Sequence, residues 1–146
     1  MDSIESRLNQ LLELSNAHLI EHSGRTLYEH LINTAAIARS VADDDNVVLA
    51  CSCHSIYGTQ FFKHQCLNDD MRPIVKDVIG DYAESLVWFF CKAFRPFEIN
   101  KDKKFYKIKT SIGEMTITKK QVIDLYFMET CNLMEQRIAK GKNNEN

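Results

Sequence analysis

The sequence predicts a mainly α-helical protein, a bundle of about six helices with one short β-hairpin before the last helix. Apolar residues recur at helical spacing over most of the chain, and polar capping pairs mark several helix starts. Strict alternation of apolar and polar residues is confined to residues 105–118. The length of 146 residues suits one domain over residues 1–140, followed by a polar tail at 141–146.

The first helix is predicted over residues 3–17. Apolar side chains recur there at helical spacing, and Asp2 and Glu5 have the spacing of a capping box. Residues 18–25 show no periodicity and contain a glycine, so a loop is expected between the first helix and the second.

The second helix begins at a capping box formed by Thr26 and Glu29, and it is predicted over residues 27–41. Its inner face carries His30 among apolar side chains. A buried imidazole requires either a hydrogen-bond partner or a metal ion, which makes this histidine a candidate functional residue.

Three aspartates at residues 43–45 end the second helix and cap a third, predicted over residues 46–53. The spacing that an EF-hand calcium loop needs is missing, so capping is the favoured interpretation. His54 follows the apolar run of this helix, directly before a turn at Gly58 and Thr59. This position suits an imidazole that is presented in a cleft.

Two further helices are predicted over residues 71–79 and 82–94, after an irregular segment at 60–70. Asp81 and Glu84 again have the spacing of a capping box and open the second of them. The apolar and aromatic character of this helix marks it as the central element of the core.

The β-hairpin is predicted from the alternation within residues 105–109 and 115–118. Thr118 and Gln121 form a further capping pair, which opens the last helix over residues 119–139. Five lysines in this region are either a solvated face or an attraction for an anionic substrate; they are Lys101, Lys103, Lys104, Lys107 and Lys109.

Composition narrows the classes of function. Hydrophobic residues make up 45% and charged residues 26% of the chain, as in ordinary globular proteins. The formal net charge of −2 gives no basic footprint, so no nucleic-acid partner is expected. No apolar run approaches the ~20 residues that span a bilayer, and the first residues lack the pattern of a signal peptide. Together with five cysteines, an odd number that favours reduced thiols, this predicts a cytoplasmic protein without membrane contact.

The two histidines on inner helices form the main candidate site. His30 and His54 lie on adjacent predicted helices, so both can reach one divalent metal ion such as Mn, Fe or Zn. The alternative is that each is a core histidine whose hydrogen bonds are satisfied by the protein.

The segments that carry these histidines resemble a known superfamily. Residues 23–30 read Ser-Gly-Arg-Thr-Leu-Tyr-Glu-His, and residues 49–54 read Leu-Ala-Cys-Ser-Cys-His. These stretches resemble the HD-domain superfamily, most closely the hydrolase domain of RelA/SpoT-type alarmone enzymes, over about residues 21–90. The resemblance implies a helical bundle whose metal ligands are a histidine, then a His-Asp pair, then a late aspartate.

Carried over to this chain, the resemblance implies that His30 and His54 are the first two ligands. Asp124 on the last helix would be the late aspartate, with Glu129 as its competitor. Ser55 stands where the motif has its aspartate, and a neutral hydroxyl is a poor ligand for a hard cation. The Glu-Asp pair that follows the motif in alarmone hydrolases is replaced by Tyr-Gly-Thr at residues 57–59.

The first functional hypothesis is a variant metal-dependent hydrolase that acts on a small phosphorylated or nucleotide substrate. His22 would be an additional metal ligand, and Ser55 or Tyr57 would orient the substrate or water. Thr59 would contact the substrate, and an arginine would hold the phosphate oxygens. The arginine candidates are Arg25, Arg72 and Arg95.

Two other hypotheses remain open. An HD-type iron oxygenase would use His22 and His64 as extra ligands, without the usual bridging carboxylate. A binding or regulatory module would have kept the fold and lost the ions, and Ser55 is the residue that favours it. In any of these cases the chain is a candidate homodimer.

Overall fold

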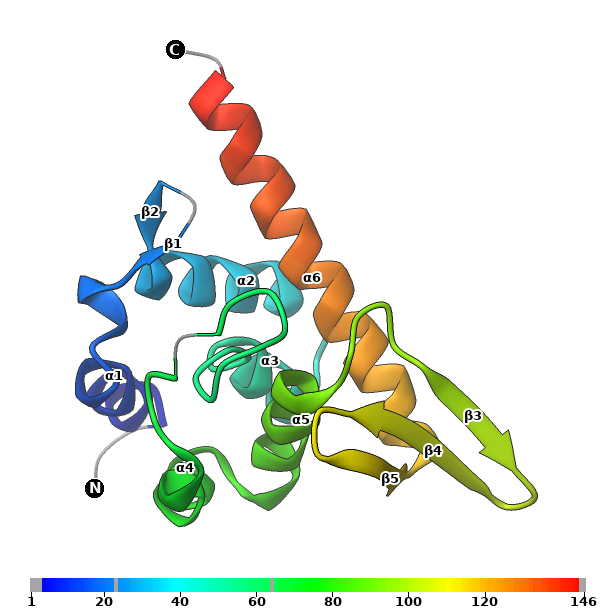
Figure 1. The fold of residues 1–146 in the computed structure, drawn as a ribbon. Helices are drawn as coiled ribbons and strands as arrows, with labels where there is room; N and C mark the ends of the chain where they lie inside the picture. Colours follow the sequence, from blue (N-terminus) through cyan, green and yellow to red (C-terminus); the bar gives the residue numbers. More distant parts are fainter. Residues whose placement is uncertain (1–3, 23, 64, 145–146) are drawn as a thin grey trace.

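The computed structural model describes residues 4–22, 24–63 and 65–144. Within them the chain forms six α-helices (Figure 1). In chain order these are α1 (Ile4–Leu14), α2 (Leu27–Val41), α3 (Asp45–Cys51), α4 (Arg72–Ile79), α5 (Asp81–Lys92) and α6 (Lys119–Asn144). Two short 3₁₀ helices, Ala17–Leu19 and Asp69–Met71, precede β1 and α4.

Two antiparallel sheets accompany the helices. The first pairs β1 (Glu21–His22) with β2 (Arg25–Thr26), inside the segment that was predicted to be a loop. The second has the order β3-β4-β5 and consists of β3 (Ile99–Asp102), β4 (Phe105–Thr110) and β5 (Gly113–Ile117). The prediction of a helical bundle with one hairpin is therefore wrong: the described chain is a mixed α/β structure.

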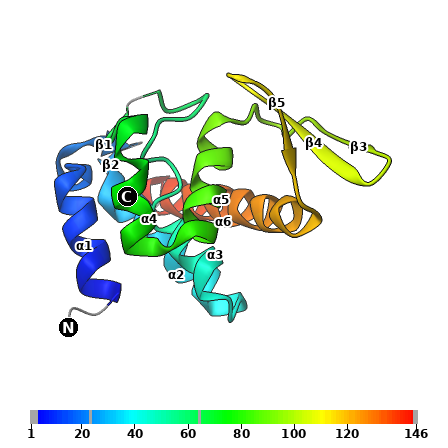
Figure 2. The same ribbon diagram turned by 90° about the horizontal axis from the view of Figure 1, so that it is seen from below.

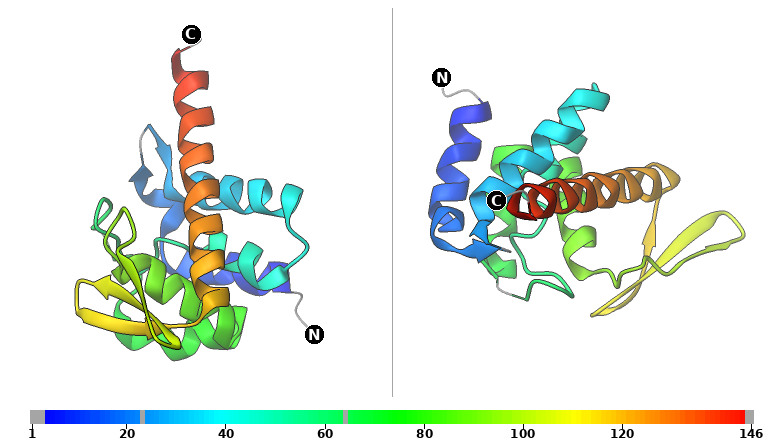
Figure 3. Two further views of the ribbon diagram at one scale, coloured as in Figure 1. Left: turned by 90° about the vertical axis from the view of Figure 1, so that its right-hand side faces the viewer. Right: turned by 90° about the horizontal axis from the view of Figure 1, so that it is seen from above.

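The elements are arranged around α6, which runs along the whole body. It packs against α2, α3 and α5, and its C-terminal end extends past the other helices (Figures 1 and 3). The three-stranded sheet extends from the opposite end of α6, away from α1 (Figures 1 and 2). The helices thus enclose the core, and the sheet stands beside it.

The capping pairs predicted at the starts of α2 and α6 are confirmed. The Thr26 side chain accepts from the Glu29 backbone N–H, and the Glu29 carboxylate accepts from the Thr26 N–H. Thr118 and Gln121 make the same reciprocal pair before α6. Because such bonds join residues only three positions apart, they are visible in the sequence.

The remaining helix ends bring one confirmation and several corrections. The Asp44 side chain caps α3, as the aspartate run predicted. Asp81 does not cap α5, because Gly80 occupies the N-cap and Glu84 is engaged elsewhere. Helix α1 ends earlier than predicted, and the proposed cap residue Asp2 lies outside the described residues. Residues 141–144, expected to be a tail, continue α6.

The core is formed by apolar side chains from all six helices and from the three-stranded sheet, and two histidines lie within it. His30 is 1% exposed and His54 is 2% exposed. Burial at this level obliges each ring nitrogen to find a partner. No helix in the described ranges combines the length and the apolar character that crossing a membrane requires.

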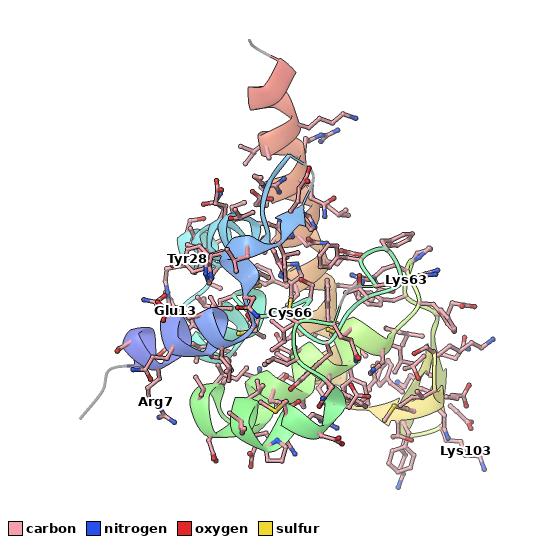
Figure 4. All side chains as sticks on the ribbon, turned by 60° about the vertical axis from the view of Figure 1, so that its left-hand side comes forward. Arg7, Glu13, Tyr28, Lys63, Cys66 and Lys103 are labelled. Atoms are coloured by element: carbon pink, nitrogen blue, oxygen red, sulfur yellow. The ribbon has the colours of Figure 1, made fainter. Side chains whose placement is uncertain are left out.

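The five lysines of the sheet region lie apart from the histidines. Lys103 occupies the turn between β3 and β4, at the outer end of the sheet (Figure 4). Lys101 and Lys107 lie on β3 and β4, and Lys107 pairs with Asn100 and Thr116. The solvated-face interpretation of these lysines is the one that their positions favour.

Candidate functional site

A cavity of about 300 Å³ lies between β1, the turn after α3, the end of α5 and one face of α6. Its polar lining includes His22, His30, His54, Ser55, Arg95 and Glu129. Phe61, Phe62 and Phe90 contribute aromatic surface. Concave sites that combine aromatic walls with a few convergent polar groups are typical of small-molecule binding.

Three separate elements bring the histidines together. His30 lies on α2, His22 ends β1, and His54 follows α3 in a turn that Gly58 completes with a φ of 84°. The Nε2 atoms of His30 and His54 are 3.1 Å apart. The ring of His22 stacks on that of His30, with centroids 4.2 Å apart and 9° between the planes.

The orientation of His54 is fixed by the backbone. Its Nδ1 lies 2.7 Å from the carbonyl oxygen of Cys51. A carbonyl oxygen only accepts, so Nδ1 carries the proton and the Nε2 lone pair points toward His30. The other face of the ring is held by an edge contact with Phe90, with centroids 5.2 Å apart.

His30 is held on its other side by charged groups. Its Nδ1 lies 2.5 Å from Oε1 of Glu135, a buried carboxylate on α6. Nη2 of Arg25 lies 3.1 Å from the same Nδ1 and also donates to Oε1 of Glu135. Asn33 donates to the second oxygen of that carboxylate at 3.5 Å.

All three imidazoles are kept in their neutral form. Burial lowers the pKa of His30 to about 3, with additional lowering from His22 and Arg25. Burial also lowers the pKa of His54 to about 3, and the neighbouring His30 adds to this effect. The pKa of His22 is lowered by burial and by Arg25. Neutral imidazole is the form that binds metal ions.

Three buried polar atoms at the cavity have no hydrogen-bond partner on any other described residue: Ser55 Oγ, His22 Nδ1 and Arg95 Nε. A buried polar atom without a partner costs about 1–3 kcal/mol, so such atoms are rare and require an explanation. Their presence around one cavity indicates that it holds water or a polar ligand.

Arg95 and a polar stripe on α6 form the opposite wall. Arg95 lies over the Phe90 ring at 4.2 Å and contacts both carboxylate oxygens of Glu129, at 3.4 and 3.5 Å. Asn132 donates to Glu129 at 2.8 Å, and Gln136 donates to Asn132 at 3.2 Å. Burial lowers the pKa of Arg95, but guanidinium keeps its charge in proteins.

Several residues proposed from the sequence do meet at this cavity. Ser55, Thr59 and Arg95 line it together with the three histidines His22, His30 and His54. The Thr59 hydroxyl also accepts from the Phe62 backbone N–H at 2.9 Å, which shapes the turn at the rim. Arg25 lies behind His30, where it donates a hydrogen bond to Glu135.

Three proposed residues lie elsewhere. Tyr57 donates to Glu84 at 2.8 Å, and Arg72 makes two bonds to the same carboxylate, so both belong to a separate buried cluster. Asp124 accepts from Tyr82 at 2.6 Å and from Lys120 at 2.8 Å. The predicted late aspartate therefore does not face the histidines. His64 lies outside the described residues.

The α6 residues that do face the histidines are Glu129, Asn132 and Glu135, of which only Glu129 was considered from the sequence. A sequence signal for Glu135 exists, because it continues the buried stripe of Leu125, Met128 and Cys131. A charged residue in register with an apolar stripe is rarely buried without a partner.

The donor set at the cavity is small. No group of three or more His, Cys, Asp or Glu side chains that could hold a metal ion occurs within the described part of the chain. Two opposed imidazole nitrogens can still reach a common ion, because ordinary histidine–metal distances of about 2.0–2.1 Å span their separation. The cavity therefore offers a metal ion two protein ligands and leaves its other coordination positions open.

Comparison with known proteins identifies a family. A family model described as a domain of unknown function, DUF6817, matches residues 11–95. No curated protein and no solved structure matches the chain. The matched segment contains the three histidines and Ser55 and ends at Arg95, whereas α6 lies beyond it. Since the match covers more than half of the sequence, the chain belongs to the DUF6817 family.

Proposed function

We propose that this protein is a metal-dependent hydrolase of a small phosphorylated substrate, with one divalent cation held by His30 and His54. One observation carries the proposal. The Nε2 lone pair of His54 points at Nε2 of His30, 3.1 Å away, inside a cavity where other buried polar atoms lack partners among the residues that the structure describes. A shared cation satisfies both nitrogens.

The surrounding groups suit an anionic substrate. Arg95 presents a buried guanidinium whose Nε has no partner among the described residues, and its contacts to Glu129 are long, at 3.4 and 3.5 Å. A phosphate oxygen can therefore accept from Arg95 without breaking a strong ion pair. The Ser55 hydroxyl donates to a second oxygen or to a water.

A bound divalent ion supplies a water of lowered pKa and neutralises phosphate charge. The chain contributes the other requirements. His30 and His54 stay neutral because they are buried, and Asn132 keeps the Glu129 carboxylate in place. The motif resemblance to HD-type hydrolases is a further reason to expect this chemistry, but the proposal does not depend on it.

A second candidate function is a binding or regulatory module that holds a phosphorylated small molecule without hydrolysing it. The observation that favours it is the small donor set, with no cluster of three ligating side chains in the described residues. An oxygenase with two irons needs more ligands than the described residues of this cavity provide.

The proposal is tested by phosphate release from a panel of small phosphomonoesters, using chelator-treated protein with and without added Mn²⁺. We expect release that depends on Mn²⁺, and a fall of about 10²–10³-fold when Arg95→Gln removes a charge that stabilises the transition state. His54→Ala should abolish release. The matched control is His18→Ala, since His18 is exposed and lies outside the cavity.

The absence of Mn²⁺-dependent release from every substrate would contradict the hydrolase. If phosphomonoesters nevertheless bind, with affinity that depends on Arg95, the binding module becomes the better description.

A further inference from the structure

The two sides of the His30 ring have different surroundings. Nε2 faces His54 in the cavity, and Nδ1 faces Glu135 and Arg25 behind it. A neutral imidazole has one N–H and one lone pair, so the partner on the Nδ1 side decides what the Nε2 side offers to a ligand.

The contacts at Nδ1 allow two assignments. Arg25 Nη2 could donate to an unprotonated Nδ1 at 3.1 Å, or a protonated Nδ1 could donate to Glu135 Oε1 at 2.5 Å. The shorter contact decides between them. A carboxylate oxygen and an unprotonated nitrogen are both acceptors, and 2.5 Å is too close for two acceptors without a proton between them.

The proton therefore lies on Nδ1 of His30, and its Nε2 carries a lone pair. The Cys51 carbonyl imposes the same arrangement on His54. Two lone pairs then face each other across 3.1 Å in a buried site. This arrangement is unfavourable when the site is empty and favourable when both nitrogens bind one cation, which lies to the side of the line that joins them because 3.1 Å is less than twice the histidine–metal distance of about 2.0–2.1 Å.

We propose that Glu135 is a positioning residue that holds His30 in the Nδ1–H tautomer and so prepares Nε2 as a ligand; this rests on the proposed function. Arg25 supports it, since it donates both to Glu135 and, at 3.3 Å, to the His22 carbonyl. It thereby ties the β1-β2 hairpin to α6. Carboxylates that bind the outer nitrogen of a metal-ligating histidine orient the ring and raise its basicity.

The test is the tautomer of His30 in chelator-treated protein, read from ¹⁵N chemical shifts and long-range ¹H–¹⁵N correlations of the imidazole. In the unaltered protein we expect Nδ1 to be protonated and Nε2 to be unprotonated. In Glu135→Ala we expect the proton to move to Nε2, where it can donate to Nε2 of His54. Glu135→Gln should restore the Nδ1–H form, because its amide oxygen still accepts from Nδ1.

The matched control is Asp124→Asn, a second carboxylate on the same helix whose hydrogen bonds go to Tyr82 and Lys120. It should leave the His30 tautomer unchanged. Zn²⁺ affinity, measured by calorimetry, should fall by about 10- to 100-fold in Glu135→Ala and by less than tenfold in Glu135→Gln.

Protonation of Nε2 in the unaltered protein would overturn the inference, and this measurement needs no variant that might fold poorly. Retention of the Nδ1–H form and of full Zn²⁺ affinity in Glu135→Ala would overturn it too. If the unaltered protein shows the Nδ1–H form but binds no metal, the assigned tautomer stands, and the metal-dependent function is what fails.

Discussion

Two buried carboxylates, Glu84 and Glu135, are each bound by an arginine. They differ in whether the polar atoms around them all have hydrogen-bond partners. Glu84 accepts from the Tyr57 hydroxyl at 2.8 Å and from two nitrogens of Arg72 at 2.8 and 2.7 Å. Arg72 also lies over the Trp88 ring at 4.0 Å. None of the buried side-chain atoms of this cluster lacks a partner within the described part of the chain.

The Glu135 cluster lies next to the histidine cavity. Glu135 satisfies His30 and Arg25, but the cavity beyond His30 contains Ser55 Oγ and His22 Nδ1 without partners on any other described residue. The difference separates two uses of buried charge in one small protein. Satisfied polar groups stabilise the fold, whereas those gathered at a cavity without a protein partner are available to water or to a ligand.

The largest effect that follows from this comparison is the loss of Glu84. Glu84→Ala removes the acceptor of both Tyr57 and Arg72, and breaking a buried pair costs about 3–5 kcal/mol. We expect the free energy of unfolding to fall by about 3 kcal/mol, the lower end of that range, because the Arg72 side chain is 28% exposed and can reach water. Urea unfolding measures the loss. A change below about 1 kcal/mol would mean that Glu84 is not a structural carboxylate.

A smaller effect on stability is expected when a single hydroxyl group is removed from either site, at Tyr57 or at Ser55. Tyr57→Phe removes a bond to a buried carboxylate and should cost about 1.5–3 kcal/mol. Ser55→Ala removes a hydroxyl that has no partner on any other described residue, and it should change the free energy of unfolding by less than about 0.5 kcal/mol. Urea unfolding of both variants, after chelator treatment, makes the comparison. Equal costs would show that Ser55 is already satisfied by the protein.

The helix starts could be predicted wherever the signal is local. The Thr26–Glu29 and Thr118–Gln121 pairs depend only on residues three positions apart, and both form as predicted. The pair at Asp81 and Glu84 has the same spacing but does not cap its helix. Tertiary contacts engage Glu84 instead, and no local pattern reveals them.

The strands were predicted only in part. The β4-β5 hairpin has visible alternation, but β3 exposes every residue except Ile99, so its sequence shows no apolar period. β1 and β2 contain two residues each, too few for any periodic signal. Their pairing places His22 beside His30, and the sequence did not predict that pairing.

The sequence predicts the histidine side of the candidate site but not most of the side that α6 contributes. His30, His54 and Ser55 come from short patterns on neighbouring elements, and they do meet. The contribution of α6 depends on the rotation of a 26-residue helix against α2 and α3. That rotation directs Asp124 toward Tyr82 and brings Glu135 to His30, and it is set by packing across the whole core.

Equilibrium metal binding shows whether His30 and His54 share a cation, as proposed. Chelator-treated protein is titrated with Mn²⁺ and Zn²⁺ by calorimetry, beside His54→Ala and the exposed-histidine control His18→Ala. We expect one ion per chain in the unaltered protein and in the control, and no binding at this site in His54→Ala. Absence of binding in the unaltered protein, or equal binding in His54→Ala, would contradict the proposal.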